Sequence, residues 1–157
     1  MRAYEMLVMT RFIAAGAGFL LAVLWFDLMF DVQVARHRLS EPPEGVLASI
    51  AGYYRRVTTG ARPMNRLVAG AMVATLGTII AQIARGDHPR WLGWVSLVLA
   101  GAPILLAGGH TVPSAIRLGS RRDPLGDQAR LARLILRDHV LCAVSILALL
   151  VVQLVAG

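Results

Sequence analysis

Residues 134–156 read LILRDHVLCAVSILALLVVQLVA, and no charged side chain follows His139 in this stretch. A helix of about 20 mostly apolar residues crosses the hydrocarbon core of a bilayer. The stretch therefore predicts a transmembrane helix. Three further stretches have the same character, at residues 12–30, 64–84 and 91–109. We predict one integral membrane domain over residues 1–157, an all-α bundle of four transmembrane helices.

The composition supports a membrane class and argues against nucleic-acid binding. Hydrophobic residues make up 57% of the chain, whereas soluble domains are nearer 45–50% apolar. The net charge of +7 comes from arginines that flank the apolar stretches, and no aromatic–basic platform accompanies them. We expect the lipid bilayer, and no nucleic acid, as a partner. All 16 cations are arginine, which is typical of a GC-rich bacterial genome.

The connections between the predicted spans differ in length and character. The connection at residues 85–90 is short, so the second and third spans should be antiparallel neighbours. In the first long connection, apolar residues recur at helical spacing and predict an amphipathic interfacial helix. In the second, Asp123 and Pro124 are typical of an N-cap and the first helical position of a helix that leads into the fourth span. The apolar residues of the first connection are Val46, Leu47, Ile50, Tyr54 and Val57.

Arginine is distributed unevenly between the two sides of the bundle. The N-terminus, the short connection and the C-terminus share one side, with four arginines, and the two long connections share the other, with twelve. Because cytoplasmic loops carry an excess of arginine and lysine, we expect a multi-pass protein of the bacterial inner membrane with long cytoplasmic loops and both termini outside. The arginines of the two sides are Arg2, Arg11, Arg85 and Arg90, against Arg36, Arg38, Arg55, Arg56, Arg62, Arg66, Arg117, Arg121, Arg122, Arg130, Arg133 and Arg137.

Two carboxylates near the cytoplasmic end of the first span are the leading candidate site residues. Asp27 and Asp31 are four residues apart, so they share one helix face. Carboxylates inside a span are costly and indicate function unless they are paired. Three interpretations stay open: a clamp to an arginine or histidine of another span, an acid–base or ligand-orienting role, and an ion or proton pathway. A catalytic role predicts that Asp27→Asn abolishes activity in a protein that still folds.

Histidines converge at the same predicted depth. His110 follows two glycines and could cap the helix, act as a base or bind a metal or haem iron. His139 adjoins Asp138, but neighbouring residues on a helix do not face one another. The two are therefore not a dyad by themselves. We count Asp27, Asp31, His110, Asp138 and His139 as candidate catalytic residues.

Polar groups at the starts of the second and fourth spans could orient a substrate. As candidates for an anion or carbonyl clamp we take Asn65, Arg66, Arg117 and Arg137. No spacing typical of a metal site occurs, and the lone Cys142 excludes an internal disulfide. We therefore predict no metal site; haem is a candidate cofactor without a supporting motif.

One stretch after the third span resembles a known family. It reads Val112-Pro113-Ser114-Ala115-Ile116-Arg117-Leu118-Gly119, and an arginine-bearing helix, residues 129–133, then leads into the fourth span. This layout resembles the anthrone-oxygenase-like family of small four-helix membrane proteins. The family has asparagine where this chain has Ser114 or Ala115. The resemblance implies oxidation of an aromatic or polyketide-like substrate. The architecture alone is also similar to membrane epoxide isomerases, which carry haem between subunits.

Two functional hypotheses follow from these patterns. The first is a membrane-embedded enzyme that oxidises or isomerises a lipophilic small molecule at the polar site near the cytoplasmic interface. The second is a non-catalytic accessory or assembly subunit of a larger membrane complex. Small residues at four-residue spacing, such as Gly70, Ala74 and Thr78, favour close helix contacts in either a homo-oligomer or such a complex.

Overall fold

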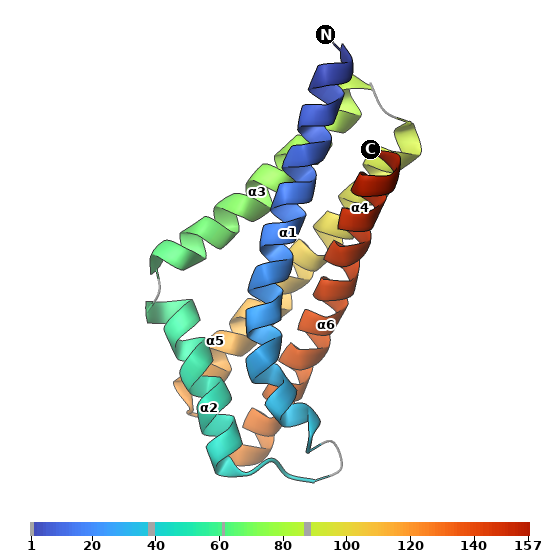
Figure 1. The fold of residues 1–157 in the computed structure, drawn as a ribbon. Coiled ribbons are helices and arrows are strands. Elements are labelled where there is room, and N and C mark those ends of the chain that lie inside the picture. The colour runs from blue at the N-terminus through green and yellow to red at the C-terminus, as the bar shows by residue number, and fades with distance from the viewer. Residues whose placement is uncertain (1, 38–39, 61, 87–88) are drawn as a thin grey trace.

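The computed structural model describes residues 2–37, 40–60, 62–86 and 89–157, and it is helical in every element that it describes (Figure 1). Four helical stretches are long and apolar enough to cross a membrane: Leu7–Ala35, Pro63–Arg85, Arg90–Ser120 and Leu125–Ala156. The predicted all-α bundle of a multi-pass membrane protein is confirmed. In chain order the elements are α1 (Arg2–Ala35), α2 (Glu44–Arg55), the π turn η1 (Arg56–Gly60), α3 (Arg62–Arg85), α4 (Arg90–Leu106), the π turn η2 (Ala107–Thr111), α5 (Val112–Ser120) and α6 (Leu125–Ala156).

The helices form an up-and-down bundle with two distinct ends. Helix α1 packs against α6, α3 and α2, and α4 packs against both α3 and α6. The start of α1, the end of α3, the start of α4 and the end of α6 lie at one end, while α2 and α5 lie together at the other (Figure 1). The antiparallel pairing of the second and third spans is therefore confirmed. The end formed by α2 and α5 is the one to which the two long, arginine-rich connections belong.

Two apolar clusters fill the bundle, one above the other. The first lies among α1, α3, α4 and α6 and includes Ile13, Leu20, Ile79, Ala100 and Leu149. The second joins the end of α1 to α2, α5 and the start of α6. Its buried members are Val34, Leu47, Ile50, Ala51, Tyr54, Ala115, Leu118, Ala129, Leu131, Ala132 and Ile135. Along both α1 and α6 the polar candidates fall between these clusters, which fixes the depth of the site.

Glycine permits close helix contacts at two places that matter for this arrangement. A Cβ on Gly16 of α1 would collide with the hydroxyl of Thr75 on α3, so the small-residue surface of α1 is used within the bundle. A Cβ on Gly119 of α5 would lie 3.0 Å from the backbone nitrogen of Arg55. The second contact presses α5 against the end of α2 and completes the layer that carries the tyrosines described below.

The third span is longer than residues 91–109, because α4 continues through η2 into α5. Pro103 lies inside α4 and has no N–H, so the carbonyl of Leu99 loses its usual donor four residues on. The hydroxyl of Ser145 on α6 donates to that carbonyl at 2.9 Å. A side chain of the neighbouring helix thus satisfies the backbone group that the proline frees.

Other predicted boundaries are also modified by the structure. Helix α1 begins at Arg2 and ends at Ala35, well outside residues 12–30, since a helix continues past the hydrocarbon-facing stretch that hydropathy detects. The predicted N-cap is wrong by one residue: Pro124 takes the N-cap position of α6, without a side-chain hydrogen bond, and Asp123 instead pairs with Arg117. The uninterrupted course of α6 into the fourth span is confirmed.

Candidate functional site

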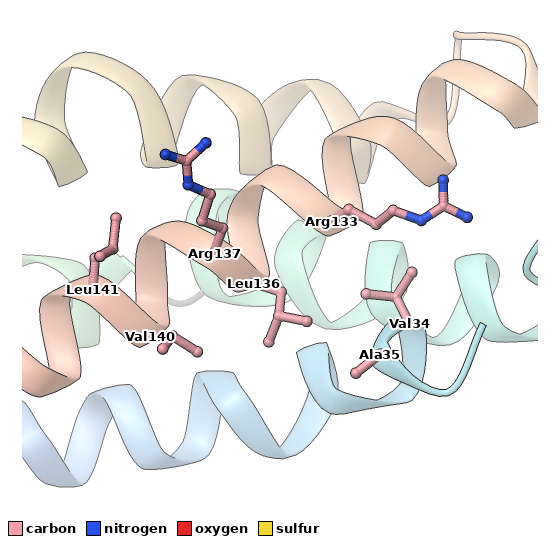
Figure 2. Close-up of a pocket in the computed structure, with 7 residues that line it drawn as sticks. All are labelled: Val34, Ala35, Arg133, Leu136, Arg137, Val140 and Leu141. Carbon is pink, nitrogen blue, oxygen red and sulfur yellow. The ribbon is translucent and has the colours of Figure 1, made fainter. Parts of the chain in front are cut away.

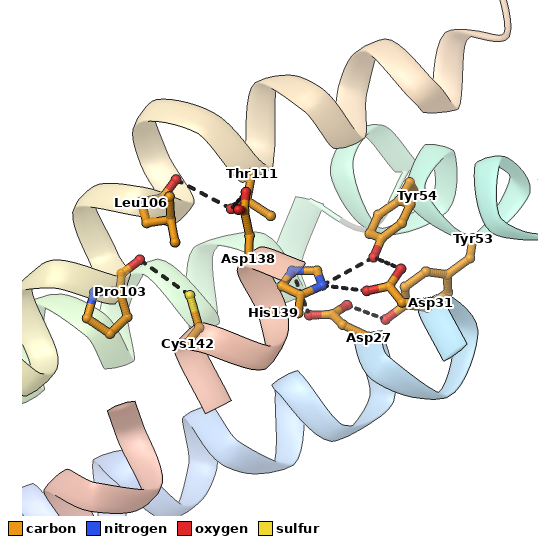
Figure 3. A network of polar contacts seen from close by, with 10 residues as sticks. All are labelled: Asp27, Asp31, Tyr53, Tyr54, Pro103, Leu106, Thr111, Asp138, His139 and Cys142. Carbon is orange, nitrogen blue, oxygen red and sulfur yellow. Dashed lines mark hydrogen bonds and ion pairs between the residues drawn. The ribbon is translucent and has the colours of Figure 1, made fainter. Parts of the chain in front are cut away.

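The polar candidates gather at the junction of the two apolar clusters, around α6 (Figure 3). Helix α1 contributes Asp27 and Asp31, and α2 contributes Tyr53 and Tyr54. Adjacent residues Asp138 and His139 point to different partners, as expected for neighbours on a helix. The junction therefore holds two imidazole–carboxylate pairs, one formed by each of these residues.

The first pair is buried between α1 and α6. The Nδ1 atom of His139 lies 2.7 Å from Oδ2 of Asp31, whose side chain is fully buried. The hydroxyl of Tyr54 donates to Oδ1 of the same carboxylate at 2.6 Å. Both oxygens of Asp31 are thus occupied by donors from other helices, which offsets the cost of burying the group.

Asp27 lies beside this pair, one turn earlier on α1. The hydroxyl of Tyr53 donates to its Oδ1 at 2.7 Å, and its Oδ2 lies 3.9 Å from Nε2 of His139. Phe30 stacks on Tyr53, with ring centroids 4.0 Å apart and ring planes 9° apart. The aromatic stack holds the tyrosine in position, so α2 is fastened to α1 by two adjacent tyrosine–carboxylate hydrogen bonds.

The tyrosines act in this network as protonated donors. Burial raises the pKa of Tyr54, and the negative charge and hydrogen bond of Asp31 raise it further. Burial likewise raises the pKa of Tyr53, and Asp27 adds to the effect. A phenolate at either position would face a carboxylate in a desolvated setting. Both hydroxyls therefore keep their protons and remain available to the carboxylates.

The second pair is more open. The Nδ1 atom of His110 lies 2.6 Å from Oδ2 of Asp138, and the hydroxyl of Thr111 donates to the same oxygen at 3.0 Å. Asp138 accepts at Oδ2, so Nδ1 of His110 carries the proton. The side chain of His110 is 46% exposed and that of Asp138 is 7% exposed. Among the described residues, nothing hydrogen-bonds Nε2 of His110.

His110 owes this position to the π turn η2. A π turn inserts one residue into a helix and is frequent at functional sites. Gly108 and Gly109 are exposed, and no atom would meet a Cβ added to either. The backbone beside His110 is therefore not covered by side chains at these two positions.

The four residues expected to orient a substrate are not gathered at the junction. Asn65 donates to the carbonyl of Thr58 at 3.0 Å and links α3 to η1. Arg117 makes two hydrogen bonds, of 2.8 and 2.9 Å, to Asp123, and these bonds lower the pKa of Asp123. Arg66 is exposed on α3, and Arg137 is exposed on the outer face of α6. None of them hydrogen-bonds a member of either pair in the described part of the chain.

Sequence reasoning missed Tyr53, Tyr54 and Thr111. Tyr54 was included among the apolar positions of the amphipathic helix, and it is buried with them. Its hydroxyl, however, reaches Asp31 across 23 residues of chain. A tyrosine at a buried helical position needs a polar partner for its hydroxyl. That requirement, together with two unpaired aspartates on the preceding helix, is the signal that could have found the contact.

A second polar cluster lies between α3, α4 and α6 near the termini. The side-chain nitrogen of Gln153 donates to Oγ of Ser96 at 2.7 Å and to Oε1 of Gln82 at 3.4 Å. Gln82 and Gln153 are buried. These hydrogen bonds link α6 to α3 and α4.

Among the described residues, no cluster of side chains supports a metal site. Within the ranges that the structure describes, no three histidine, cysteine or acidic side chains are grouped as metal ligands. A haem iron takes a single axial imidazole whose other nitrogen often donates to a carboxylate. His110 and His139 both have a carboxylate at Nδ1, but the side chain of His139 is only 10% exposed, whereas that of His110 is 46% exposed. The haem hypothesis therefore stays a prediction attached to His110.

Comparison with known protein families, with characterised proteins and with solved structures found no match to this chain. The resemblance to the anthrone-oxygenase-like family therefore stays a prediction.

Proposed function

We propose that the protein is a membrane-embedded enzyme that isomerises a lipophilic small molecule by proton transfer at the cytoplasmic interface. The observation that carries this proposal is the 2.6 Å contact between Nδ1 of the half-exposed His110 and the nearly buried Asp138. A carboxylate at Nδ1 fixes the tautomer, so Nε2 becomes the basic nitrogen. The substrate class is a molecule from the bilayer with an acidified C–H bond, such as one beside a carbonyl or an epoxide.

The reaction is redox-neutral. Nε2 of His110 takes a proton from the substrate carbon, and the electron pair of the broken C–H bond shifts into the adjacent π system or opens the epoxide. The imidazolium then returns the proton to another atom of the substrate. Asp138 stabilises the imidazolium between the two steps. An oxidation, as the family resemblance implies, would begin with the same abstraction and would consume dioxygen as the electron acceptor.

In this proposal the Asp31–His139 pair positions the helices that carry the proton-transfer pair. Asp31, His139 and Tyr54 join α1, α2 and α6 and are almost completely enclosed by them. They hold α6 at the depth that sets Asp138 against His110. Asp27, 16% exposed and 3.9 Å from His139, belongs to the same clamp.

We infer that the junction lies on the cytoplasmic side of a bacterial inner membrane, with both termini outside. Twelve of the 16 arginines belong, by sequence, to the two long connections and the residues beside them, and cytoplasmic loops carry such an excess. Helices α2 and α5, which form part of these connections, lie together at one end of the bundle (Figure 1). Helix α2 would then lie at the interface, where its exposed Arg55 and the neighbouring Arg56 meet lipid headgroups.

The test is deuterium incorporation into carbon acids. The full chain in lipid nanodiscs is incubated in D₂O with a panel of lipophilic ketones, enones and epoxides, and mass spectrometry follows exchange and isomerisation. We expect exchange with at least one class, its loss in His110→Gln, and a decrease of about a hundredfold or more in Asp138→Asn. His37→Gln is the matched control, because that histidine lies outside the junction. Equal exchange in wild type and His110→Gln contradicts the proposal.

An accessory subunit is the second candidate, and one observation favours it. Gly70, Ala74 and Gly77 form an exposed stripe on α3, and a Cβ on either glycine would meet open space. Small exposed residues at this spacing are typical of helix–helix interfaces in membranes. Crosslinking followed by purification distinguishes the candidates. A specific larger partner that is lost in Gly70→Leu supports the subunit, whereas a chain that purifies alone and exchanges deuterium supports the enzyme.

A further inference from the structure

A groove runs along the outer face of α6 beside the last turn of α1, away from the imidazole pairs. Its volume is about 360 Å³, within the range of small-molecule sites. The walls are mostly aliphatic, and two arginines one helical turn apart complete them. The lining residues are Val34 and Ala35 of α1 and Arg133, Leu136, Arg137, Val140 and Leu141 of α6.

The charged and apolar parts of the groove are separated. In Figure 2 Leu136 and Val140 face α1, the guanidinium group of Arg137 points away from α1, and that of Arg133 extends toward the start of α6. Val140 and Leu141 belong to the stretch of α6 that can cross a membrane. A ligand in the groove therefore meets both cations and an aliphatic surface.

The two arginines differ in what already holds them. Arg133 donates to the backbone carbonyls of His37 at 3.2 Å and Ser40 at 2.9 Å, so its position is fixed by the α1–α2 connection. Arg137 makes no ion pair or hydrogen bond with any described residue. The nearby carboxylates, Asp31 and Asp138, are buried and already paired with histidines. The groove thus presents positive charge that the described chain does not neutralise.

An arginine at the hydrocarbon boundary is stabilised when an anion meets it there. A guanidinium binds a phosphate oxygen pair through charge-assisted hydrogen bonds. Anionic lipids supply such phosphates at the depth where a helix leaves the bilayer. A soluble anion would leave the aliphatic walls exposed, whereas a phospholipid covers them with its acyl chain.

We propose that this groove binds one acidic phospholipid. Its phosphodiester contacts Arg137, an acyl chain lies over Leu136 and Val140, and Arg133 adds positive charge to the groove. The site is separate from the proton-transfer pair, because none of its lining residues hydrogen-bonds His110 or Asp138 among the described contacts. Its bound lipid would fasten α6 to the end of α1.

The experiment is native mass spectrometry of the delipidated full chain, titrated with dioleoyl phosphatidylglycerol or dioleoyl phosphatidylcholine. We expect one phosphatidylglycerol to bind to the wild type preferentially. Arg137→Gln should weaken that binding about tenfold, and Arg137→Lys, which keeps the charge, should weaken it less. The matched control is Arg130→Gln, an exposed arginine two turns earlier on α6 that does not line the groove.

Three results would overturn the proposal. The first is equal binding of phosphatidylglycerol and phosphatidylcholine. The second is an equal loss of phosphatidylglycerol binding in Arg130→Gln and Arg137→Gln. The third is that soluble glycerophosphoglycerol displaces the bound lipid at the same concentration as intact phosphatidylglycerol does. The last result would mean that the apolar walls contribute nothing. If Arg137→Gln does not fold, Ala35→Leu, which narrows the groove without changing charge, takes its place and must also weaken binding.

Discussion

The hydroxyl of Ser145 on α6 donates, at 2.9 Å, to the carbonyl of Leu99, the group that Pro103 leaves without a helical donor. This contact crosses between two spans and has a simple chemical cause. Its strength is therefore open to a direct test by a double-mutant cycle.

Ser145→Ala should lower the free energy of unfolding by about 0.6–1.7 kcal/mol, the range of hydrogen bonds between membrane helices. In a Pro103→Ala background the same change should cost less, because the new N–H can satisfy the carbonyl of Leu99. Unfolding in a denaturing detergent measures all four proteins. Ser49→Ala, which removes a hydroxyl from an exposed position of α2, is the control. Equal costs in both backgrounds would mean that the contact does not replace the missing donor.

The clamp interpretation of the buried pair predicts an order of stabilities. Asp31→Asn should lower the free energy of unfolding by about 1–3 kcal/mol, since it disturbs two buried hydrogen bonds. Asp27→Asn should cost less, because its carboxylate is partly exposed and keeps one acceptor for Tyr53. Unfolding and deuterium exchange are measured on the same samples. An Asp27→Asn protein that folds fully but no longer exchanges deuterium would return Asp27 to the catalytic set.

Alkaline pH should weaken the junction. The pKa values of Tyr53 and Tyr54 are raised in the folded protein, so the folded state keeps protons that the unfolded chain releases. Their contribution is complete below about pH 10, the ordinary tyrosine pKa, and decreases as the pH rises above it. Unfolding of wild type and Tyr54→Phe is compared from about pH 8 to 11. We expect the stability difference between the two proteins to shrink toward the alkaline end, and a constant difference would contradict the raised pKa.

The contact between α5 and α2 should not tolerate a larger side chain. In Gly119→Ala the new methyl group would press on the backbone of Arg55, and we expect a loss of about 1–3 kcal/mol in unfolding free energy. Gly126→Ala is the matched control, since Gly126 is a helical glycine of α6 with open space around it. That control should be neutral or gain up to about 1 kcal/mol from helix propensity. Equal effects of the two substitutions would contradict the close approach.

The sequence predicted the four long apolar helices because a membrane span must satisfy its backbone internally and present about 20 apolar residues. It did not predict where the helices end. Hydropathy reports the lipid-facing stretch, whereas α1 and the α4–η2–α5 path continue beyond it. The start of α6 was likewise predicted one residue too early. Asp123 hydrogen-bonds the guanidinium of Arg117 and does not cap α6, and Pro124 takes the N-cap position.

The candidate site was predictable in part. Asp27, Asp31, His110, Asp138 and His139 do meet at one depth, because topology alone sets the depth of each residue. Which carboxylate pairs with which imidazole depends on helix rotation, and spacing within one helix does not report it. The tyrosine contacts were not predicted because α2 was interpreted from its apolar positions alone. The hydroxyls of Tyr53 and Tyr54 extend beyond that apolar face and donate to Asp27 and Asp31.

The π turn η2 also sets the direction in which the side chains after it point. Each residue of an α-helix advances the side-chain direction by about 100°, and a π turn accommodates one residue more than an α turn. If the same residues formed a regular α-helix instead of the π turn, Val112 and everything after it would be turned by about this angle relative to α4. Ala115 and Leu118 would leave the apolar cluster, and His110 and Thr111 could not both reach Asp138. The π turn therefore sets the rotation of α5 relative to α4 about their common helical path.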